Sequence, residues 1–180
     1  MAKKTGEPSR EITERLQPAG SPRRGSYHLS AATAEPLRRK LRGRWMVVEH
    51  TLGGESYLAR FVARSLKGLE LLRAEYRAEY DFKDALCLKR VEISGALGEG
   101  EEETSYRYRL SVALSWDLDG NGSLTIRPEL GYQSTEIGGE AAAVKELDDA
   151  GEDVLVAFRF EGSSLLLEEG DDRKVLERMP

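Results

Sequence analysis

Thiols and imidazoles are scarce in this chain of 180 residues, which has one cysteine, Cys87, and two histidines, His28 and His50. A single thiol excludes a disulfide within the monomer and a zinc site built mainly of thiolates. It is consistent with a reducing compartment. No apolar run approaches the roughly 18 residues of a membrane span, and the first 30 residues contain no signal-peptide core. We therefore expect a cytoplasmic protein without a membrane span. Export is the minority alternative, because Arg23 and Arg24 precede a mildly apolar stretch and residues 32–34, Ala-Thr-Ala, resemble a cleavage site.

An excess of positive charge is also lacking, because the formal net charge is -5. This balance does not favour binding to nucleic acid. Residues 1–35 contain six basic and four acidic side chains, a net charge of +2, so residues 36–180 carry -7. The first 35 residues contain few large apolar side chains and cannot bury enough surface to offset their ordering entropy. We predict a disordered basic tail over residues 1–35 and one folded domain over residues 36–180.

Clusters typical of metal or catalytic sites are not found in the sequence. Residues 117–122 match the first half of a calcium-binding EF-hand loop, but the twelfth position is Pro128 instead of the bidentate glutamate. We interpret this segment as a hairpin turn and predict no metal and no cofactor. His50 is interpreted as a structural or exposed residue, and Cys87 as a small buried apolar one.

The clearest pattern in the sequence is an alternation of apolar and polar side chains with a period of two residues. From Leu72 to Phe82 the even positions are apolar and the odd positions are charged, and residues 106–116 follow the same rule with polar or small odd positions. A strand places successive side chains on opposite faces, so both segments are predicted strands. The helix-forming composition of residues 72–82 leaves a helix as the minority alternative. After the 117–122 turn the pattern continues with one face formed by Leu124, Ile126, Leu130 and Tyr132.

Further elements follow from the same reading. A short helix is predicted over residues 36–42, with Pro36 in its first turn. Residues 86–94 form a less regular strand that is consistent with a bulge, and residues 140–149 are predicted as an internal helix or loop excursion. The remaining predicted strands cover residues 44–52, 57–65, 153–161, 164–168 and 173–178.

About eight to nine strands joined by short polar turns indicate an antiparallel meander with one apolar face. Closing the meander into a barrel buries that face and removes exposed strand edges. A sandwich of two sheets is the structural alternative. We predict an all-β fold, an up-and-down antiparallel meander that closes into a barrel and carries a short N-terminal helix.

The segment 41–45, Leu-Arg-Gly-Arg-Trp, precedes the first predicted strand and resembles the Gly-x-Trp signature of lipocalin and calycin barrels. In that family an arginine near the end of the barrel commonly covers this tryptophan, which the resemblance assigns to Arg178 over Trp45. A second motif of the Thr-Asp-Tyr type, a secretory signal and a disulfide are not found. The resemblance, over about residues 36–180, is therefore to the loose bacterial lipocalin-like families. It implies a lipocalin-like barrel and transfers no catalytic residue.

Aromatic side chains gather on the predicted apolar face, where they offer stacking surface and hydroxyl groups. In an open barrel such a lining suits a flat, partly polar ligand. We therefore expect non-enzymatic binding of a small apolar or aromatic molecule. The residues predicted to line the cavity are Tyr76, Tyr80, Tyr106, Tyr108 and Trp116. Two alternatives remain: a filled barrel that acts as a protein-interaction module, and a barrel isomerase or cyclase, which would need a pocket-facing His50 or a buried Glu49 with a shifted pKa.

Overall fold

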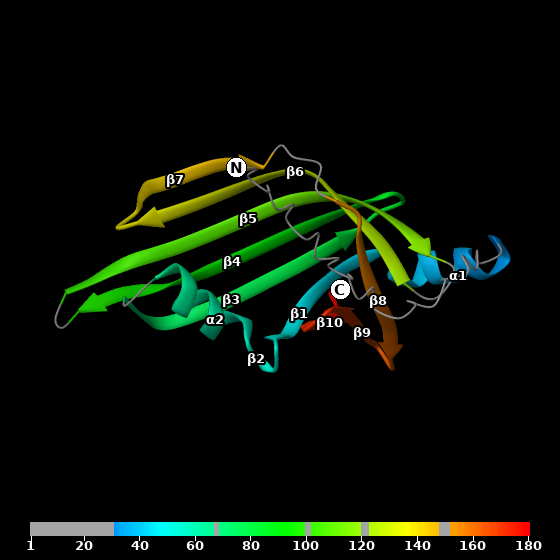
Figure 1. The fold of residues 1–180 in the computed structure, drawn as a ribbon, viewed down its shortest axis with the longest axis horizontal. Coiled ribbons are helices and arrows are strands. Elements are labelled where there is room, and N and C mark those ends of the chain that lie inside the picture. Colours follow the sequence, from blue (N-terminus) through cyan, green and yellow to red (C-terminus); the bar gives the residue numbers. More distant parts are fainter. Residues whose placement is uncertain (1–30, 67–68, 100–101, 120–122, 148–151) are drawn as a thin grey trace, which may run out of the picture.

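The computed structural model describes residues 31–66, 69–99, 102–119, 123–147 and 152–180, which form a largely β molecule (Figure 1). The predicted tail over residues 1–35 lies mostly outside these ranges, and the first helix begins at Ala31. The elements in chain order are α1 (Ala31–Leu41), β1 (Gly43–Leu52), β2 (Glu55–Ser56), α2 (Tyr57–Ser65), β3 (Glu70–Phe82), β4 (Leu86–Glu99), β5 (Glu102–Asp119), β6 (Ser123–Ile137), β7 (Glu140–Leu147), β8 (Val154–Glu161), β9 (Ser164–Glu169) and β10 (Asp172–Arg178).

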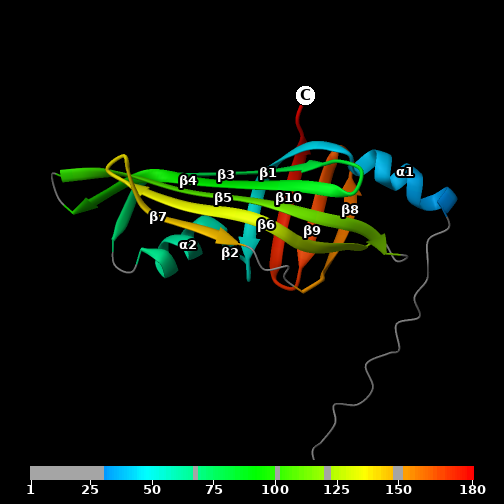
Figure 2. The ribbon, with the colours of Figure 1, turned by 90° about the horizontal axis from the view of Figure 1, so that it is seen from above.

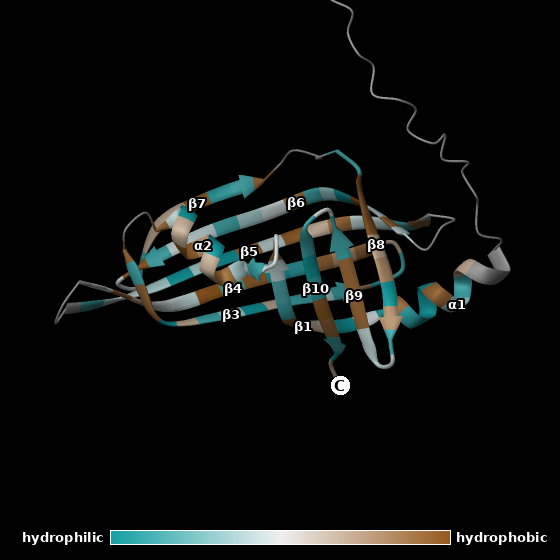
Figure 3. Cartoon of the chain, turned by 60° about the horizontal axis from the view of Figure 1, so that its bottom comes forward, coloured by the Kyte–Doolittle hydropathy of each residue, from teal (hydrophilic) through white to brown (hydrophobic). Residues whose placement is uncertain are grey.

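Eight of these strands form a closed antiparallel barrel. The order is β1, β3, β4, β5, β6, β8, β9 and β10, and β10 pairs back with β1. Strand β2 is an addition to β1, and β7 is an addition to β6. The predicted meander, its closure into a barrel and the short helix near the N-terminal end are confirmed. Figure 3 shows hydrophobic and hydrophilic residues alternating along the barrel strands.

The strands of the barrel differ in length, and this asymmetry shapes the molecule. Strands β3 to β6 have 13 to 18 residues, whereas β8, β9 and β10 have 6 to 8. Strands β3 to β6 therefore extend beyond the closed barrel as a sheet that the short strands do not cover. Figure 2 shows α2 beneath this extension, with β2 and β1 between it and the short strands β8 to β10.

Strand pairing is interrupted at two places in the barrel wall. The β1–β3 ladder ends at the Met46–Glu79 pair, beyond which residues 47–52 of β1 and residues 70–78 of β3 are not paired with each other. We call this interruption the β1/β3 seam. On the other side, β6 pairs with β8 as far as Ile126 and with β7 from Gly131 onward. We call the intervening residues, 127–130, the β6 seam.

The structure explains why glycine occurs at position 43 and tryptophan at position 45 of the Gly-x-Trp segment. The indole of Trp45 is 2% exposed and its Nε1–H donates to the Leu41 carbonyl at 2.7 Å. The guanidinium carbon of Arg178 lies 4.6 Å from the centre of the Trp45 ring, and Nη2 donates to the Lys40 carbonyl. Gly43 has φ +116°, and a Cβ there would lie 3.2 Å from Arg178 Nη1. A glycine is required because it supplies both the backbone conformation and the space for the guanidinium. The expected cover of Trp45 by Arg178 is confirmed.

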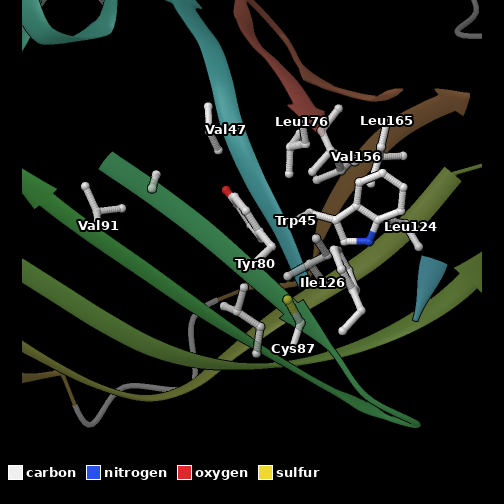
Figure 4. Close-up of a cluster of buried hydrophobic side chains, with 14 of the residues drawn as sticks. Trp45, Val47, Tyr80, Cys87, Val91, Leu124, Ile126, Val156, Leu165 and Leu176 are labelled. Atoms are coloured by element: carbon white, nitrogen blue, oxygen red, sulfur yellow. The ribbon is translucent and has the colours of Figure 1, made fainter. Parts of the chain in front are cut away.

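The barrel is densely filled at the end where α1 lies. Trp45 packs against Phe160, with ring centroids 6.1 Å apart, and Phe82 meets Trp116 edge to face at 5.5 Å. Aromatic pairs of this geometry add to the free energy of burying their apolar surface. Aliphatic side chains from several strands complete the cluster around Trp45, as Figure 4 shows for Leu124, Val156 and Leu165.

The predicted strand over residues 57–65 is wrong, because this segment forms helix α2. Apolar pairs recur four residues apart, with Tyr57 and Leu58 followed by Phe61 and Val62. This spacing places all four on one helical face, which packs against the core. The alternation of Tyr57, Ala59, Phe61 and Ala63 reads as a strand only when residues 58 and 62 are ignored.

The predicted helix or loop over residues 140–149 is also wrong, because Glu140–Leu147 forms the edge strand β7. It pairs with residues 131–137 of β6 as the return arm of a hairpin through Gly138 and Gly139. Both glycines have positive φ, at 64° and 84°, which suits a tight turn. Strand pairing therefore overrides the helix propensity of the alanine run.

Bulges occur in places that the pattern did not indicate. Strand β4 pairs with β5 without interruption from Leu86 to Glu99, so the bulge predicted within residues 86–94 is wrong. The extra residues lie in β3, between Leu72 and Glu75, and in β6, beside Pro128. A single extra residue moves the following side chains to the other face. This is why Tyr132, which was predicted on the inner face, is 50% exposed and lies opposite Ser111 on the outer face.

Candidate functional site

A cavity of about 300 Å³ lies within the barrel, between the filled end and helix α2. Most of its wall is aliphatic. Strands β5, β6, β7, β8 and β9 contribute Leu110, Val112, Leu114, Ile126, Pro128, Leu130, Leu147, Val154, Val156 and Leu167. This volume is at the lower end of the range for small-molecule sites, roughly 300–1,000 Å³.

One side of the cavity is polar, in contrast to the aliphatic wall. It is lined by Tyr80 of β3, Lys89 of β4, Glu169 of β9, and Asp172 and Lys174 of β10. Lys174 is 6% exposed, and its Nζ donates to Asp172 Oδ2 at 2.5 Å. Charged groups are rarely buried to this degree unless they are paired, and this pair meets that condition.

His50 extends this polar group toward the β1/β3 seam. Its Nε2 lies 2.8 Å from Asp172 Oδ1 and its Nδ1 lies 2.6 Å from the Tyr76 hydroxyl. The imidazole also stacks on Tyr57 of α2, with ring centroids 4.1 Å apart and planes inclined by 6°. The chain Lys174–Asp172–His50–Tyr76 therefore connects β10, β1 and β3 across the region where β1 and β3 no longer pair.

A bulge in β1 turns His50 inward. The register between β1 and β10 shifts between Val47 and Glu49. Without this extra residue, the alternation that buries Trp45 and Val47 would place Glu49 inside and His50 outside. Instead Glu49 lies on the outer face, where it accepts a hydrogen bond from Arg173 Nη1 at 2.7 Å. Glu49 is therefore not the buried carboxylate that the enzyme alternative would need.

The partners of His50 determine its tautomer and its charge. Burial lowers the pKa of His50 and outweighs the opposing effect of its hydrogen bond to Asp172. Burial alone would raise the pKa of Asp172, but hydrogen bonds from His50 and Lys174 lower this pKa to about 2. An ionised carboxylate only accepts hydrogen bonds, so Nε2–H of a neutral His50 donates to Asp172. Nδ1 then accepts the hydrogen bond that the Tyr76 hydroxyl donates.

This arrangement favours recognition over catalysis. Both nitrogens of His50 are engaged by protein groups, which leaves neither nitrogen available as a base for a bound molecule. Burial raises the pKa of the Tyr76 and Tyr80 phenols, so both hydroxyls stay protonated and serve as hydrogen-bond donors. Burial also raises the pKa of the Cys87 thiol to about 12, which makes it a poor nucleophile.

The five aromatic residues predicted to line a cavity are distributed along the barrel. Tyr80 lines the cavity. Tyr76 hydrogen-bonds to His50, and Tyr108 packs against Phe61 of α2 with ring centroids 5.0 Å apart. Tyr106 is buried on the same face of β5 as Tyr108. Trp116 lies at the filled end, where its Nε1–H donates to the Lys83 carbonyl at 3.1 Å.

The charged residues of the cavity were missed at the level of sequence, although their positions carried a signal. Lys174 and Asp172 precede Leu176 at steps of two, and Lys89 lies between Cys87 and Val91 at the same spacing. Each therefore occupies an inward position of its strand. A charged residue in an otherwise apolar face is unusual, and this exception marks the polar side of the cavity.

Residues 117–119 of the predicted hairpin turn belong to the end of β5, where they pair with residues 123–125 of β6. Asp117 forms an ion pair with Arg38 of α1, and its Oδ1 accepts the Leu118 backbone N–H at 2.8 Å. Residues 120–122 of the EF-hand-like segment lie outside the described residues. Within the described ranges, no group of three or more His, Cys, Asp or Glu side chains is placed to hold a metal ion.

Neither of the two described helices has the length and apolar character to cross a membrane.

Charges on the outer face of β3 to β6 pair largely with one another. Glu79 accepts hydrogen bonds from Arg44 at 3.2 Å and Arg90 at 2.9 Å, which lower its pKa. Arg109 bridges Glu92 and Glu136 at 3.1 Å each. This exterior is thus a mixed-charge surface, which contrasts with the apolar cavity inside the same strands.

The chain was compared with known protein families, with curated proteins and with solved structures, and none of the three comparisons found a match.

Proposed function

We propose that the protein binds a small, largely apolar organic molecule inside its barrel and performs no chemistry on it. The single observation that carries this proposal is the cavity of about 300 Å³ whose aliphatic wall is formed by β5 to β9. A fully packed barrel would have voids little larger than a water molecule at this position. The lipocalin-like resemblance supports the same function by analogy of fold, and the single buried cysteine suits action in the cytoplasm.

The β6 seam is the proposed route into the cavity. Pro128 and Leu130 of this seam line the cavity together with Leu147 of β7. Leu130 is 47% exposed, so the cavity wall reaches the surface here. Pro128 has no N–H group to leave unpaired, which makes it suited to a position between two pairing partners.

The test is a titration with N-phenyl-1-naphthylamine, a neutral aromatic probe whose fluorescence rises in apolar surroundings. We expect saturable binding with one site per chain. Val112→Phe and Val156→Phe each add bulk to the cavity wall and should weaken binding at least tenfold. Val144 of β7 is 70% exposed and away from the cavity, so Val144→Phe serves as the matched control and should bind as the wild type does.

Overpacking costs typically 1–3 kcal/mol, so each variant is first checked for cooperative urea unfolding. Binding that survives in both folded cavity variants would place the probe elsewhere on the protein. Absence of binding in the wild type would remove the proposal and favour the interaction-module alternative.

A further inference from the structure

Lys89 is a cationic side chain that points into the barrel. It lies on β4 directly opposite Tyr80 of β3 and Val112 of β5, two residues that line the cavity. Its neighbours at steps of two, Cys87 and Val91, are both buried in the core. The amine of Lys89 is therefore presented to the cavity by the same alternation that forms its aliphatic wall.

The buried charges around Lys89 are paired with each other, while its own amine is not. Within the described ranges, no carboxylate lies within ion-pair distance of Lys89, and its recorded contact is with the Tyr80 ring, 5.8 Å from Nζ to the centroid. Both oxygens of Asp172 are engaged, one by His50 and the other by Lys174. Glu169 also lines the cavity without an ion-pair partner among the described residues, but it is exposed at the end of β9, where solvent screens its charge. Lys89 is half-buried, so its ammonium is the unpaired charge that is better shielded from solvent.

Tyr80 offers a second polar group beside this amine. Figure 4 shows its hydroxyl directed away from β3 toward the barrel interior. Because the phenol keeps its proton, it can donate a hydrogen bond to a neighbouring anion. An ammonium and a phenol hydroxyl that line the same cavity are suitable donors for a carboxylate or sulfonate.

The geometry points to an amphipathic organic acid as the ligand: an apolar body against the aliphatic wall, with its anionic group bound by Lys89 and Tyr80. This inference rests on the proposed function and specifies the chemical class of its ligand. An aliphatic wall alone would accept neutral molecules equally well. The half-buried Lys89 favours the acid because an unpaired charge shielded from solvent is stabilised by an opposite one.

Two probes with one aromatic skeleton test this inference. 1-Anilinonaphthalene-8-sulfonate carries an anionic group that N-phenyl-1-naphthylamine lacks. We expect the wild type to bind the sulfonate more tightly than the neutral probe. Lys89→Met should weaken sulfonate binding about tenfold to hundredfold, the range for one charged hydrogen bond, and change neutral-probe affinity less than twofold. Lys145→Met removes the same charge from exposed β7 and should change neither affinity.

The results of this experiment distinguish a failure of the proposed function from a failure of the inferred ligand class. If both probes bind and Lys89→Met leaves the ratio of their affinities unchanged, the acid is the wrong ligand class and the cavity remains a neutral site. If neither probe binds to the wild type, the proposed function fails and this inference fails with it. Lys89→Gln, which keeps a polar group, repeats the test should the methionine variant unfold. Near-ultraviolet circular dichroism verifies fixed packing, because the sulfonate probe also binds partly unfolded chains.

Discussion

The two interruptions in the barrel wall are closed in different ways. At the β1/β3 seam, side chains replace the missing backbone ladder: His50 bonds to Tyr76, and α2 stacks Tyr57 on the imidazole. At the β6 seam, the strand passes from one partner to another through Pro128 and the half-exposed Leu130, and the cavity lies behind it. The first seam is sealed by aromatic and polar contacts, whereas the second is lined by aliphatic side chains.

Because of this difference, we expect one seam to contribute to the stability of the fold and the other to the access of a ligand to the cavity. A strand edge inside a barrel must have its polar groups satisfied or covered. The β1/β3 seam meets this requirement with the buried network, so substitutions there should lower the free energy of unfolding. The β6 seam carries the exposed ion pair of Arg127 with Asp153 but no buried network among its described residues. Substitutions at its apolar positions should therefore change the passage of a ligand with little effect on stability.

The largest loss of stability is expected from Phe61→Ala in α2. The ring contacts Tyr108 of β5, with centroids 5.0 Å apart, and so holds in place the helix whose Tyr57 stacks on His50 at the β1/β3 seam. Fully buried Phe→Ala changes cost about 3–5 kcal/mol, and the partly buried Phe61 should lose about 2–3 kcal/mol. Urea unfolding measures this loss, and Leu130→Ala at the β6 seam is the comparison, with an expected loss below about 1 kcal/mol. Equal losses would contradict the distinction between the two seams.

Asp172→Asn should have the next largest effect at neutral pH. It removes the carboxylate that accepts from both His50 and Lys174 and leaves the buried ammonium without a counter-charge. Hydrogen bonds to charged groups contribute about 1.5–3 kcal/mol, so we expect a loss of about 2 kcal/mol. The measurement is the free energy of unfolding at pH 7, followed over a range of pH.

The pH dependence of Asp172 has a definite sign. Its pKa in the folded protein, about 2, lies below the usual value for an unfolded chain, about 3.9. The stabilisation is therefore present above about pH 4 and is lost as the pH falls through about 2. His50, Lys174, Lys89, Tyr80 and Glu169 face this carboxylate or lie beside it. Wild type and Asp172→Asn should thus converge in acid, and a constant difference down to pH 2 would contradict the assignment.

A smaller effect is expected from Tyr76→Phe, which leaves Nδ1 of His50 without its donor. An unsatisfied buried acceptor costs about 1–3 kcal/mol, and we expect about 1 kcal/mol because the ring still fills its place. The hydroxyl stabilises the neutral imidazole, so its removal should raise the pKa of His50 toward 6.5. Nuclear magnetic resonance titration of the His50 ring measures this change. An unchanged pKa would mean that the Tyr76 hydrogen bond does not maintain the neutral imidazole.

The barrel was predictable from sequence because regular alternation determines which face of a strand is buried. The same alternation failed wherever one extra residue entered a strand. The bulge near Val47 turned His50 inward, and the bulge beside Pro128 turned Tyr132 outward. A bulge depends on the pairing of two distant segments, so neither strand alone reveals it. Lys89 and Lys174 were missed for another reason: the predicted lining was aromatic, whereas these two are charged side chains at inward positions.

The smallest effect on stability, within about 0.5 kcal/mol, is expected from Leu130→Trp at the β6 seam. Its side chain is 47% exposed and lines the cavity, so a larger ring can lie across the opening without displacing the core. Stopped-flow mixing with N-phenyl-1-naphthylamine should show association slowed several-fold, since passage through the wall becomes limiting. Val144→Trp on the exposed face of β7 controls for the added indole and should leave the association rate unchanged. Association as fast as in the wild type would show that the ligand reaches the cavity by another route, and the β6 seam would then be only a change of strand partner.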